Sequence, residues 1–407
     1  MQRVWVASEL YYPEDTSTGY FLTRIAEGLA GTFDVHVICG RPSYSARGLR
    51  VTATEQRAGT TIHRMPATRF DKDRLLLRLV NAATFTIVTF VFALLRLRRG
   101  DVVLVVTNPP TLPAVIVAAA RLRGARTTLL VHDVYPEILA ATGIVARDGA
   151  PYRVLAALFA KLARACDTIV VLGRDMRDVM AAKLGPAGPA VVIIPNWGDI
   201  DTIDPAARDA NALRCKLGLD GKFVVQFSGN AGRTHDLDAV LDCAAASSDR
   251  DDVHFLLIGY GGKFAGVADR IARRGLTNIT LLPRQPRDVL ATMLTGSDLT
   301  VIPFIEGMIG LSVPSRMYNV MAAGVPIAAM TDARSELALV VAETRCGWIL
   351  APGDAGALAA LTKDLAAGRA MGEARQRGDA GRRAAEADYT IDRVIARYAE
   401  TLSGLAG

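Results

Sequence analysis

The stretch FSGNAGRTHDLDAVL, residues 227–241, decides the fold that the sequence predicts. It continues an apolar, β-branched run, and after Gly229 and Gly232 the apolar residues recur at helical spacing. The two glycines allow a tight turn and close approach of another backbone or a ligand. Asn230, Arg233 and His235 lie in this turn or next to it. A strand, a glycine loop and a helix in this order form the unit that binds phosphate in many α/β proteins, although a loop that only packs would show the same pattern.

The same alternation of strand-like and helix-like runs extends over most of the chain. Strands are predicted at residues 3–8, 33–40, 101–107, 127–133, 167–173, 190–196, 222–229, 253–259, 278–283, 298–304, 325–330 and 347–352. Helices fit between them, as in parallel sheets that are covered on both faces. The sequence therefore predicts two Rossmann-like, doubly wound α/β domains, at residues 1–200 and 201–385, followed by an amphipathic helix within 386–407.

Composition limits the classes of partner and the compartment. The 407 residues are 51% hydrophobic and 22% charged, which is typical of a globular protein, and the formal net charge is +6. The basic residues are spread along the chain with no block of Lys and Arg among aromatics, which disfavours nucleic acid and suits anionic small molecules or an anionic membrane. Five widely spaced cysteines without a C-x-x-C motif indicate a reducing compartment and no zinc site.

Residues 79–95, LVNAATFTIVTFVFALL, contain no charge and are followed by Arg96, Arg98 and Arg99, with arginines also at 74 and 78. The run is short for a membrane span, which needs about 20 apolar residues. A buried domain helix and a helix lying in the membrane interface, anchored by arginines at its ends, both fit. A true span fits least well.

Residues 310–327, GLSVPSRMYNVMAAGVPI, predict a loop, a short helix and a strand. Pro314 suits the first helical position, with Ser312 near the N-cap, and Gly324 suits the position after the helix. Arg316 is unusual because a cation in the first turn opposes the helix dipole. Either the arginine points into solvent, or it binds a phosphate together with the N–H groups around Ser312 and Ser315.

Three further stretches place polar residues at predicted strand ends. Gly261, Gly262 and Lys263 repeat the glycine-loop pattern, and Glu306 follows another strand, where its carboxylate could bind ribose or sugar hydroxyls or could simply be exposed. His132 and Asp133 end a strand of the first domain, where they could transfer a proton or hold a hydroxyl, or act only as a cap and a structural histidine. In open α/β sheets ligands bind at such ends, and two domains in tandem would place a ligand cleft between them.

The ordered set of stretches YYPEDTSTGYFLTRIAEGLA, GRPSY, NPPTLP, HDVYPE, IPNWGD, FSGNAGRTHDLD and GLSVPSRMYNVMAAGVPI resembles the retaining, family-4-type glycosyltransferases of GT-B architecture. The set runs from residue 11 to residue 327 and so spans both domains. It is most similar to the bacterial branch that includes N-acetyl-L-fucosaminyl transferases of surface-polysaccharide assembly, such as O-antigen, capsule or exopolysaccharide. The resemblance also implies that the last helix crosses back to the N-terminal domain.

The resemblance implies retaining transfer of a sugar, with neither cofactor nor metal, from a nucleotide diphosphate sugar to a polyprenyl-diphosphate-linked acceptor. For the branch, the expected donor is a UDP-linked, N-acetylated deoxyhexosamine, and the expected location is the inner face of the cytoplasmic membrane. The donor diphosphate would bind at Ser312–Arg316 and at the loop Gly229–Arg233. The acceptor would approach Gly19 and Tyr20, with His132 and Asp133 near the transferred sugar. A lipid-linked acceptor also favours the interfacial interpretation of residues 79–95.

The sequence departs from the family pattern at two places, since the cationic residue after Pro-Ser is commonly lysine and here is Arg316, and the acidic pair of the family is missing. Many family-4 enzymes carry two glutamates eight positions apart, the second five residues before the glycine that ends the helix. Counting back from Gly324 gives Asn319 and then Leu311, and Glu306 is out of register. Asn319 would therefore contact the donor ribose as a neutral amide. A sugar-nucleotide epimerase of the same architecture and a non-catalytic nucleotide-sugar or glycan-binding protein are the alternative functions.

Overall fold

A computed structural model describes residues 1–43, 46, 48–68, 70, 75–208 and 211–405 of the chain. Its contacts divide the chain into two compact units. Unit 1 comprises Met1–Ala140, Val145–Pro195 and the segment that begins at Asp392, and unit 2 comprises Ala141–Ile144 and Asn196–Ile391. The sequence puts the division at residue 200, and the contacts put it between Pro195 and Asn196.

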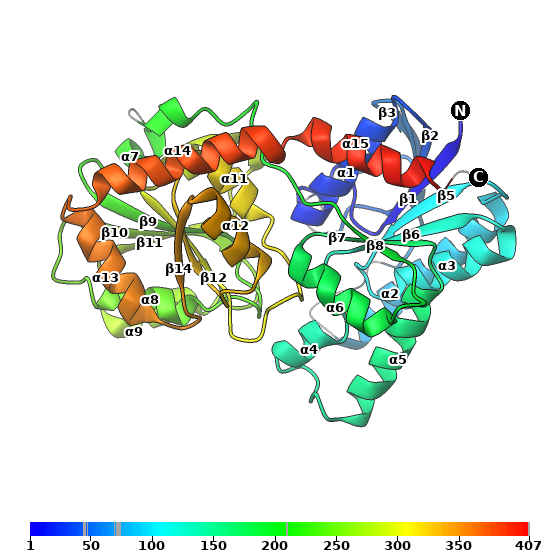
Figure 1. Cartoon of the computed structure of the whole chain (residues 1–407), viewed down its shortest axis with the longest axis horizontal. Coiled ribbons are helices and arrows are strands. Elements are labelled where there is room, and N and C mark those ends of the chain that lie inside the picture. Colours follow the sequence, from blue (N-terminus) through cyan, green and yellow to red (C-terminus); the bar gives the residue numbers. More distant parts are fainter. Residues whose placement is uncertain (44–45, 47, 69, 71–74, 209–210, 406–407) are drawn as a thin grey trace. The chain divides into compact units, whose positions relative to one another are not determined.

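The described residues of unit 1 form an eight-stranded sheet in the order β3-β4-β2-β1-β5-β6-β7-β8, in which only the β3–β4 pair is antiparallel (Figure 1). The strands are Arg3–Ser8 (β1), Asp34–Gly40 (β2), Thr54–Arg57 (β3), Thr60–Met65 (β4), Val102–Val106 (β5), Arg126–Val131 (β6), Thr168–Val171 (β7) and Ala190–Ile193 (β8). All five residues of β5 are buried, because helices cover both faces of a parallel sheet.

The helices of unit 1 come from both ends of the chain. They are Ser17–Leu29 (α1), Leu75–Arg96 (α2), Leu112–Arg123 (α3), Glu137–Ala141 (α4), Ala150–Arg164 (α5), Arg174–Leu184 (α6) and Ile391–Ser403 (α15). In Figure 1 the red α15 lies beside the blue α1. The two helices meet where Ile395 covers Gly28, since a Cβ on that glycine would lie 2.8 Å from Ile395 Cγ1. Arg397 then donates to the carbonyl of Ile193 at 2.6 Å, so the last helix belongs to the N-terminal unit.

Unit 2 is built on a six-stranded parallel sheet in the order β11-β10-β9-β12-β13-β14. Its strands are Phe223–Asn230 (β9), Val253–Tyr260 (β10), Ile279–Pro283 (β11), Leu299–Pro303 (β12), Ile327–Met330 (β13) and Gly347–Leu350 (β14). Its helices are Ala212–Leu217 (α7), Leu237–Ala245 (α8), Val267–Arg274 (α9), Leu290–Thr295 (α10), Arg316–Ala322 (α11), Glu336–Thr344 (α12), Ala355–Ala366 (α13) and Met371–Asp388 (α14), with short 3₁₀ turns at Pro205–Arg208 and Arg287–Val289.

Alternating residues of β9 serve the two faces of this sheet. Phe223, Val225 and Phe227 join the larger core, which α8, α9 and α13 complete. Val224 points the other way, into a smaller core with Leu219 and Met293. Burying one such side chain stabilises the fold by about 1.5–3 kcal/mol, so the sheet is fixed in register and its strand ends are rigid supports for a site.

Every strand that the sequence predicts is present, and the predicted class of two Rossmann-like α/β domains is confirmed. The predicted start of the helix after β12 is wrong. The helix begins at Arg316 with Ser315 at its N-cap, because Pro314 lies in a preceding turn in which its carbonyl accepts the N–H of Met317. Gly324 follows the helix with φ +64°, as predicted.

Helix α2 contains the uncharged segment 79–95 and is buried on one face only. Phe85, Thr89 and Ala93 pack inward. The other face carries a stripe of exposed apolar side chains, namely Leu76, Val80, Ile87, Val91 and Leu95, of which Leu76 is 76% exposed and Leu95 73%. The helix is therefore not simply a buried domain helix. Within the described residues no helix is long and apolar enough to cross a bilayer, and Arg74 lies outside them.

Candidate active site

One candidate site lies where the strand order of unit 2 reverses. The chain goes from β9 outward to β10 and β11 and returns to the other side of β9 as β12, and ligands of α/β sheets bind outside the carboxyl ends of such strands. The segments after β9 and β12 are tied together there. Asp236 N–H donates to the carbonyl of Pro303 at 2.8 Å, and Ile305 N–H donates to that of Thr234 at 3.1 Å.

The loop after β10 joins the same edge. Ala231 N–H donates to the carbonyl of Tyr260 at 2.7 Å, and Lys263 N–H donates to that of Ala231 at 3.2 Å. The side chain of Asn230 fills the space over Gly261, since a Cβ on that glycine would lie 2.3 Å from Asn230 Oδ1. The two glycine loops predicted from the sequence are therefore one continuous structure.

Arg316 reaches back from the start of α11 onto this structure. Its Cζ lies 4.7 Å from the centre of the Phe227 ring, and its Nη2 donates to the carbonyl of Asn230 at 3.4 Å. The guanidinium also covers Gly229, where a Cβ would lie 3.0 Å from Cζ and Nη2. Gly229 has φ +130°, a conformation that side-chain-bearing residues rarely adopt, so glycine is required both by the backbone and by the arginine.

The positive charge of this site has no acidic partner among the described residues. Arg316 forms no ion pair there, and its buried Nη1 has no hydrogen-bond partner. Lys263 Nζ donates to the carbonyl of His235 at 2.8 Å, which adds a second cation beside the loop. Burial lowers the pKa of Arg316 to about 10, so the guanidinium is still charged at neutral pH. An anion placed on this edge would compensate both cations.

His235 is a site residue that the sequence places only near the helix entry. Its ring lies between Phe227 and Phe304, with centroid distances of 5.8 and 5.3 Å. Burial, and then the charges of Arg316 and Lys263, hold its pKa well below 6.5, so the imidazole is neutral. Its Nε2 has no partner among the described residues.

The other residues predicted to bind the donor sugar differ in solvent exposure and in the contacts that they already make. Arg233 is exposed, and Ser312 and Ser315 are half-buried ahead of α11. Asn319 is buried, and its amide oxygen accepts the N–H of Asp199 at 2.8 Å, which ties the segment after Asn196 to α11. Glu306 is exposed in the turn after β12. Asn319 thus has a structural task in addition to the predicted contact with ribose.

A separate candidate site lies in unit 1, at the end of β6. The backbone N–H groups of His132 and Asp133 both point to Thr107 Oγ1, at 3.2 and 3.5 Å. Burial lowers the pKa of His132 to about 4 and raises that of Asp133 to about 6. No hydrogen bond joins the two side chains within the described part of the chain, so the structure does not make them a hydrogen-bonded His–Asp pair.

The preceding loop of the chain explains why residue 19 is a glycine. It lies in the first turn of α1, where its N–H donates to Thr16 Oγ1 at 3.1 Å. A Cβ on Gly19 would lie 2.6 Å from the carbonyl oxygen of Glu14. Tyr20 is half-buried, and its ring meets that of Phe21 edge-on at 5.5 Å. The close approach expected at Gly19 is thus made by the preceding loop, and a role in acceptor binding stays a prediction.

Comparison with known proteins assigns the family. Residues 18–197 match the family described as glycosyl transferase 4-like domain, and residues 209–384 match the family described as glycosyl transferases group 1. The probable glycosyltransferase WbjE of Pseudomonas aeruginosa is 31% identical over 367 residues, which cover 90% of this chain and 90% of that protein. The chain belongs to the glycosyltransferase family.

Two further similarities accompany this assignment. WcaI of Escherichia coli K12, a glycosyl transferase assigned to colanic acid biosynthesis, is 28% identical to the glycosyltransferase described here over 340 residues, or 80% of this chain and 83% of WcaI. HepE of Anabaena, solved with UDP and glucose, superposes with a TM-score of 0.73 at 15% identity and covers 99% of this chain and 100% of its own. The fold is therefore GT-B, with two Rossmann-like domains.

Among the described residues no group of three or more His, Cys, Asp and Glu side chains is placed to hold a metal ion.

Proposed function

We propose that this glycosyltransferase moves a sugar, with retention of anomeric configuration and without a metal, from a UDP-linked donor to a polyprenyl-diphosphate-linked acceptor. The transferred sugar is an N-acetylated deoxyhexosamine, and the product is an intermediate in the assembly of a bacterial surface polysaccharide. The similarity to WbjE and WcaI and the sequence resemblance support this assignment. The protein would act at the inner face of the cytoplasmic membrane.

The observation that carries the proposal is the guanidinium of Arg316 on the Gly229 loop, which forms no ion pair with a described residue and whose Nη1 has no hydrogen-bond partner there. In the transfer, the bond between the anomeric carbon and the β-phosphate oxygen breaks, and negative charge develops on the departing diphosphate. The acceptor hydroxyl oxygen bonds to the anomeric carbon, and its proton passes to the diphosphate. Arg316 and Lys263 are positioned to stabilise that charge, the electrostatic task that usually contributes most to catalysis.

The remaining predicted residues take subsidiary roles in this proposal. Asn230 and Arg233 extend the phosphate loop, and Ser312 and Ser315 offer hydroxyls ahead of α11. Glu306 would bind a donor hydroxyl. Asp133, with a pKa near 6, and neutral His132 would contact the transferred sugar.

The acceptor requires contact with a membrane, and the exposed stripe of α2 suits it. Five apolar side chains along 20 residues of helix, with no charged residue among those between 79 and 95, favour the interface between lipid headgroups and acyl chains. Arg96, Arg98 and Arg99 follow at one end, where they would contact anionic headgroups. We therefore propose that α2 lies in the membrane interface and does not span the bilayer.

A transfer assay tests the catalytic part. Purified protein is incubated with UDP-sugars and with a lipid extract that contains polyprenyl-diphosphate-linked sugars, and the lipid product is followed by mass spectrometry. Arg316→Ala should lower transfer by about 10²-fold or more, as the loss of a charge-stabilising donor does. Arg273→Ala removes the same charge from an exposed position on α9 and should leave the rate unchanged.

Three outcomes would contradict the assignment. Full transfer by Arg316→Ala would refute the role of the arginine. An epimeric sugar nucleotide formed from donor alone would identify an epimerase. Donor binding without product from any acceptor would identify a binding protein.

Sedimentation with phosphatidylglycerol vesicles at low salt tests the membrane part. Ile87 is 63% exposed at the centre of the stripe, and Ile87→Glu should move the protein from the vesicle pellet to the supernatant. Gln376→Glu, on the exposed face of α14, makes the same change of charge and should leave sedimentation unchanged. A wild-type protein that stays in the supernatant would contradict this part.

A further inference from the structure

A cavity lies at the opposite ends of the unit 1 strands from His132 and Asp133. It has a volume of about 830 Å³. Its lining comes from residues just ahead of strands or at their start: Gln2 before β1, Arg99 and Gly100 before β5, Arg126 at the start of β6, and Asp167 before β7. The cavity is therefore at the amino ends of the strands and is separate from the transfer site.

The lining carries an excess of positive charge. Among the described residues of the lining, Arg99, Arg121 and Arg126 contribute three guanidinium groups and Asp167 contributes one carboxylate, which leaves a net charge of +2. Arg126 Nη1 donates to Asp167 Oδ1 at 2.7 Å. The other oxygen of Asp167 accepts the N–H of Thr127 at 2.7 Å. The carboxylate of Asp167 thus already has partners without Arg99 or Arg121.

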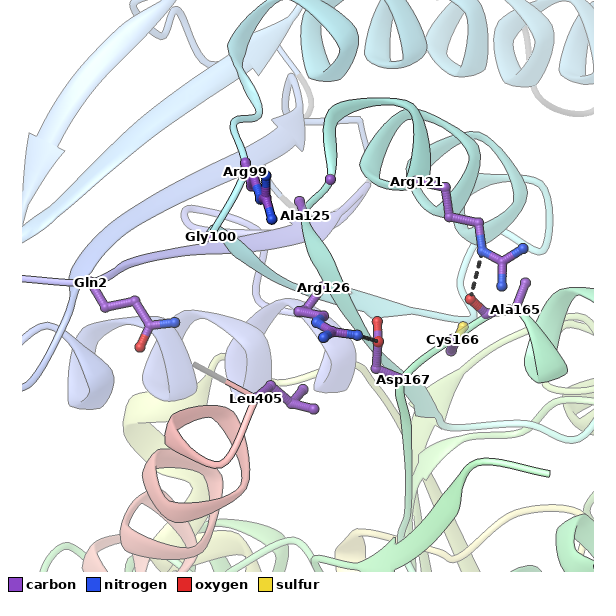
Figure 2. A pocket seen from close by; sticks show the side chains of 11 residues that line it. Gln2, Arg99, Gly100, Arg121, Ala125, Arg126, Ala165, Cys166, Asp167 and Leu405 are labelled. Atoms are coloured by element: carbon purple, nitrogen blue, oxygen red, sulfur yellow. Dashed lines mark hydrogen bonds and ion pairs between the residues drawn. The ribbon is translucent and has the colours of Figure 1, made fainter. Parts of the chain in front are cut away.

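Capping of helix ends explains one of these arginines but not the others. Arginines near helix C-termini are favourable because they oppose the dipole and bind the last carbonyls. Arg121 Nε does this, since it donates to the carbonyl of Ala165 at the end of α5, at 3.1 Å. Arg99 lies beyond the end of α2 and makes no hydrogen bond or ion pair with any described residue. Its stem rests against Gly124, and Figure 2 shows its head group in the hollow that Gln2 and Arg126 also border.

We propose that this cavity binds a phosphate ester through Arg99, with Arg121 and Arg126 completing the positive surface. Guanidinium groups bind phosphate oxygens through two parallel N–H bonds, and a net charge of +2 matches a phosphomonoester or a diphosphate. The volume falls within the range of pockets that hold a small molecule. The amide of Gln2 can bond to a hydroxyl, and Leu405 supplies apolar contact. The ester belongs either to a soluble metabolite or to a lipid headgroup, since two leucines at least 70% exposed lie near these arginines in sequence: Leu122 follows Arg121, and Leu95 lies four residues before Arg99.

Titration calorimetry with pyrophosphate tests the site. Arg316→Ala is the background, because it removes the cation of the transfer site and makes the result independent of the proposed donor. This protein should still bind one pyrophosphate. Adding Arg99→Ala should weaken binding about tenfold or more, which is the usual effect of removing a charged hydrogen-bond partner. Adding Arg98→Ala removes a neighbouring exposed arginine outside the cavity and should change the affinity little.

Absence of pyrophosphate binding in the Arg316→Ala protein, or equal weakening by both additional variants, would overturn the proposal. Arg99 is exposed and has no hydrogen-bond or ion-pair partner among the described residues, so Arg99→Ala should fold as the wild type does. Phosphatidylglycerol vesicles distinguish the source of the phosphate. Vesicle binding that falls in Arg99→Ala but not in Arg98→Ala assigns a lipid headgroup. Vesicle binding that is equal in both, with pyrophosphate binding lost only in Arg99→Ala, assigns a soluble ester.

Discussion

Replacing Gly229 by alanine should disable the donor site without removing any of its charged groups. The new Cβ would lie 3.0 Å from Arg316 Cζ and Nη2 and 3.4 Å from Nε, so the guanidinium must leave its place above Phe227. The backbone must also give up φ +130° or keep it at a cost of about 1–3 kcal/mol. The contact with the new Cβ displaces the guanidinium of Arg316 from the loop, and the backbone strain weakens the loop on which it rests.

The magnitude follows from the interaction that is lost. A charge-assisted hydrogen bond contributes about 1.5–3 kcal/mol, so the affinity for UDP should fall by about 10- to 150-fold. Calorimetric titration with UDP measures this directly. Gly232→Ala is the matched control, since its Cβ would meet only the side chain of Asn230, at an ordinary 3.9 Å.

A double-mutant cycle separates this mechanism from general damage. If Gly229→Ala acts by moving the guanidinium, then it should change little in a protein that already carries Arg316→Ala, because both substitutions remove the same interaction. Strictly additive losses in the double variant, or UDP affinity unchanged by Gly229→Ala, would refute the reasoning.

The remaining predictions concern stability and its pH dependence. Burial lowers the pKa of His63 and of His254 to about 4, so the unfolded chain binds more protons between pH 6.5 and 4, and stability should fall on acidification through that window. Each histidine should lower the free energy of unfolding by about 1–2 kcal/mol at pH 5. In denaturation experiments from pH 7 to pH 5, His63→Phe should therefore lose less stability than the wild type. An unchanged dependence of stability on pH would contradict the assignment. Burial raises the pKa of Asp133 to about 6, so the ionised carboxyl destabilises the folded protein as the pH rises. Asp133→Asn should therefore gain stability relative to the wild type between pH 4 and pH 7. A difference in stability that does not change with pH would argue against a buried carboxyl. Gly19→Ala should cost about 1–3 kcal/mol in urea denaturation because of its contact with the Glu14 carbonyl, whereas Gly31→Ala, with no atom within 4 Å, should be nearly neutral.

The sequence predicts the framework well because its strands are short β-branched runs between glycines. Residues 102–106, VVLVV, can be little else than a strand buried on both faces. The hairpin of β3 and β4 escapes such reasoning. It contains Gln56, Arg57, His63 and Arg64, and the run resembles a polar loop. The sequence signal that could have found it is Gly59, because tight hairpin turns require positive φ, and the structure shows positive φ at both Ala58 and Gly59.

Arg64 shows why polar residues can belong to the interior. It is buried, its Nη1 donates to the carbonyl of Tyr12 at 2.7 Å, and its Nη2 pairs with Glu55 at 2.7 Å across the hairpin. A buried arginine is tolerated when such partners are present, but those partners come from other parts of the chain. The burial of Arg64 therefore cannot be predicted from the periodicity of apolar residues.

The sequence predicts that the candidate site binds an anion, but it does not predict how the residues of the site are arranged in space. The glycine loops and Arg316 each indicate an anion, yet 86 residues separate Asn230 from the arginine that donates to its carbonyl. Their meeting depends on β9 and β12 being neighbours, which is a property of the sheet order. The neutral state of His235 depends likewise on the aromatic rings and cations around it. His132 and Asp133 are the converse example. They are adjacent in sequence, but adjacency alone does not make their side chains a hydrogen-bonded pair.

The most direct test of the central claim is a thermal-unfolding screen of the wild-type and Arg316→Ala proteins with UDP, GDP, TDP and ADP. A ligand that binds only the folded state, at about a hundredfold excess over its dissociation constant, stabilises it by about 2.7 kcal/mol. We predict that UDP raises the unfolding temperature of the wild type and not that of Arg316→Ala. No shift with any nucleoside diphosphate, or a shift of the same size in Arg316→Ala, would contradict the proposal that Arg316 and the Gly229 loop form the donor site.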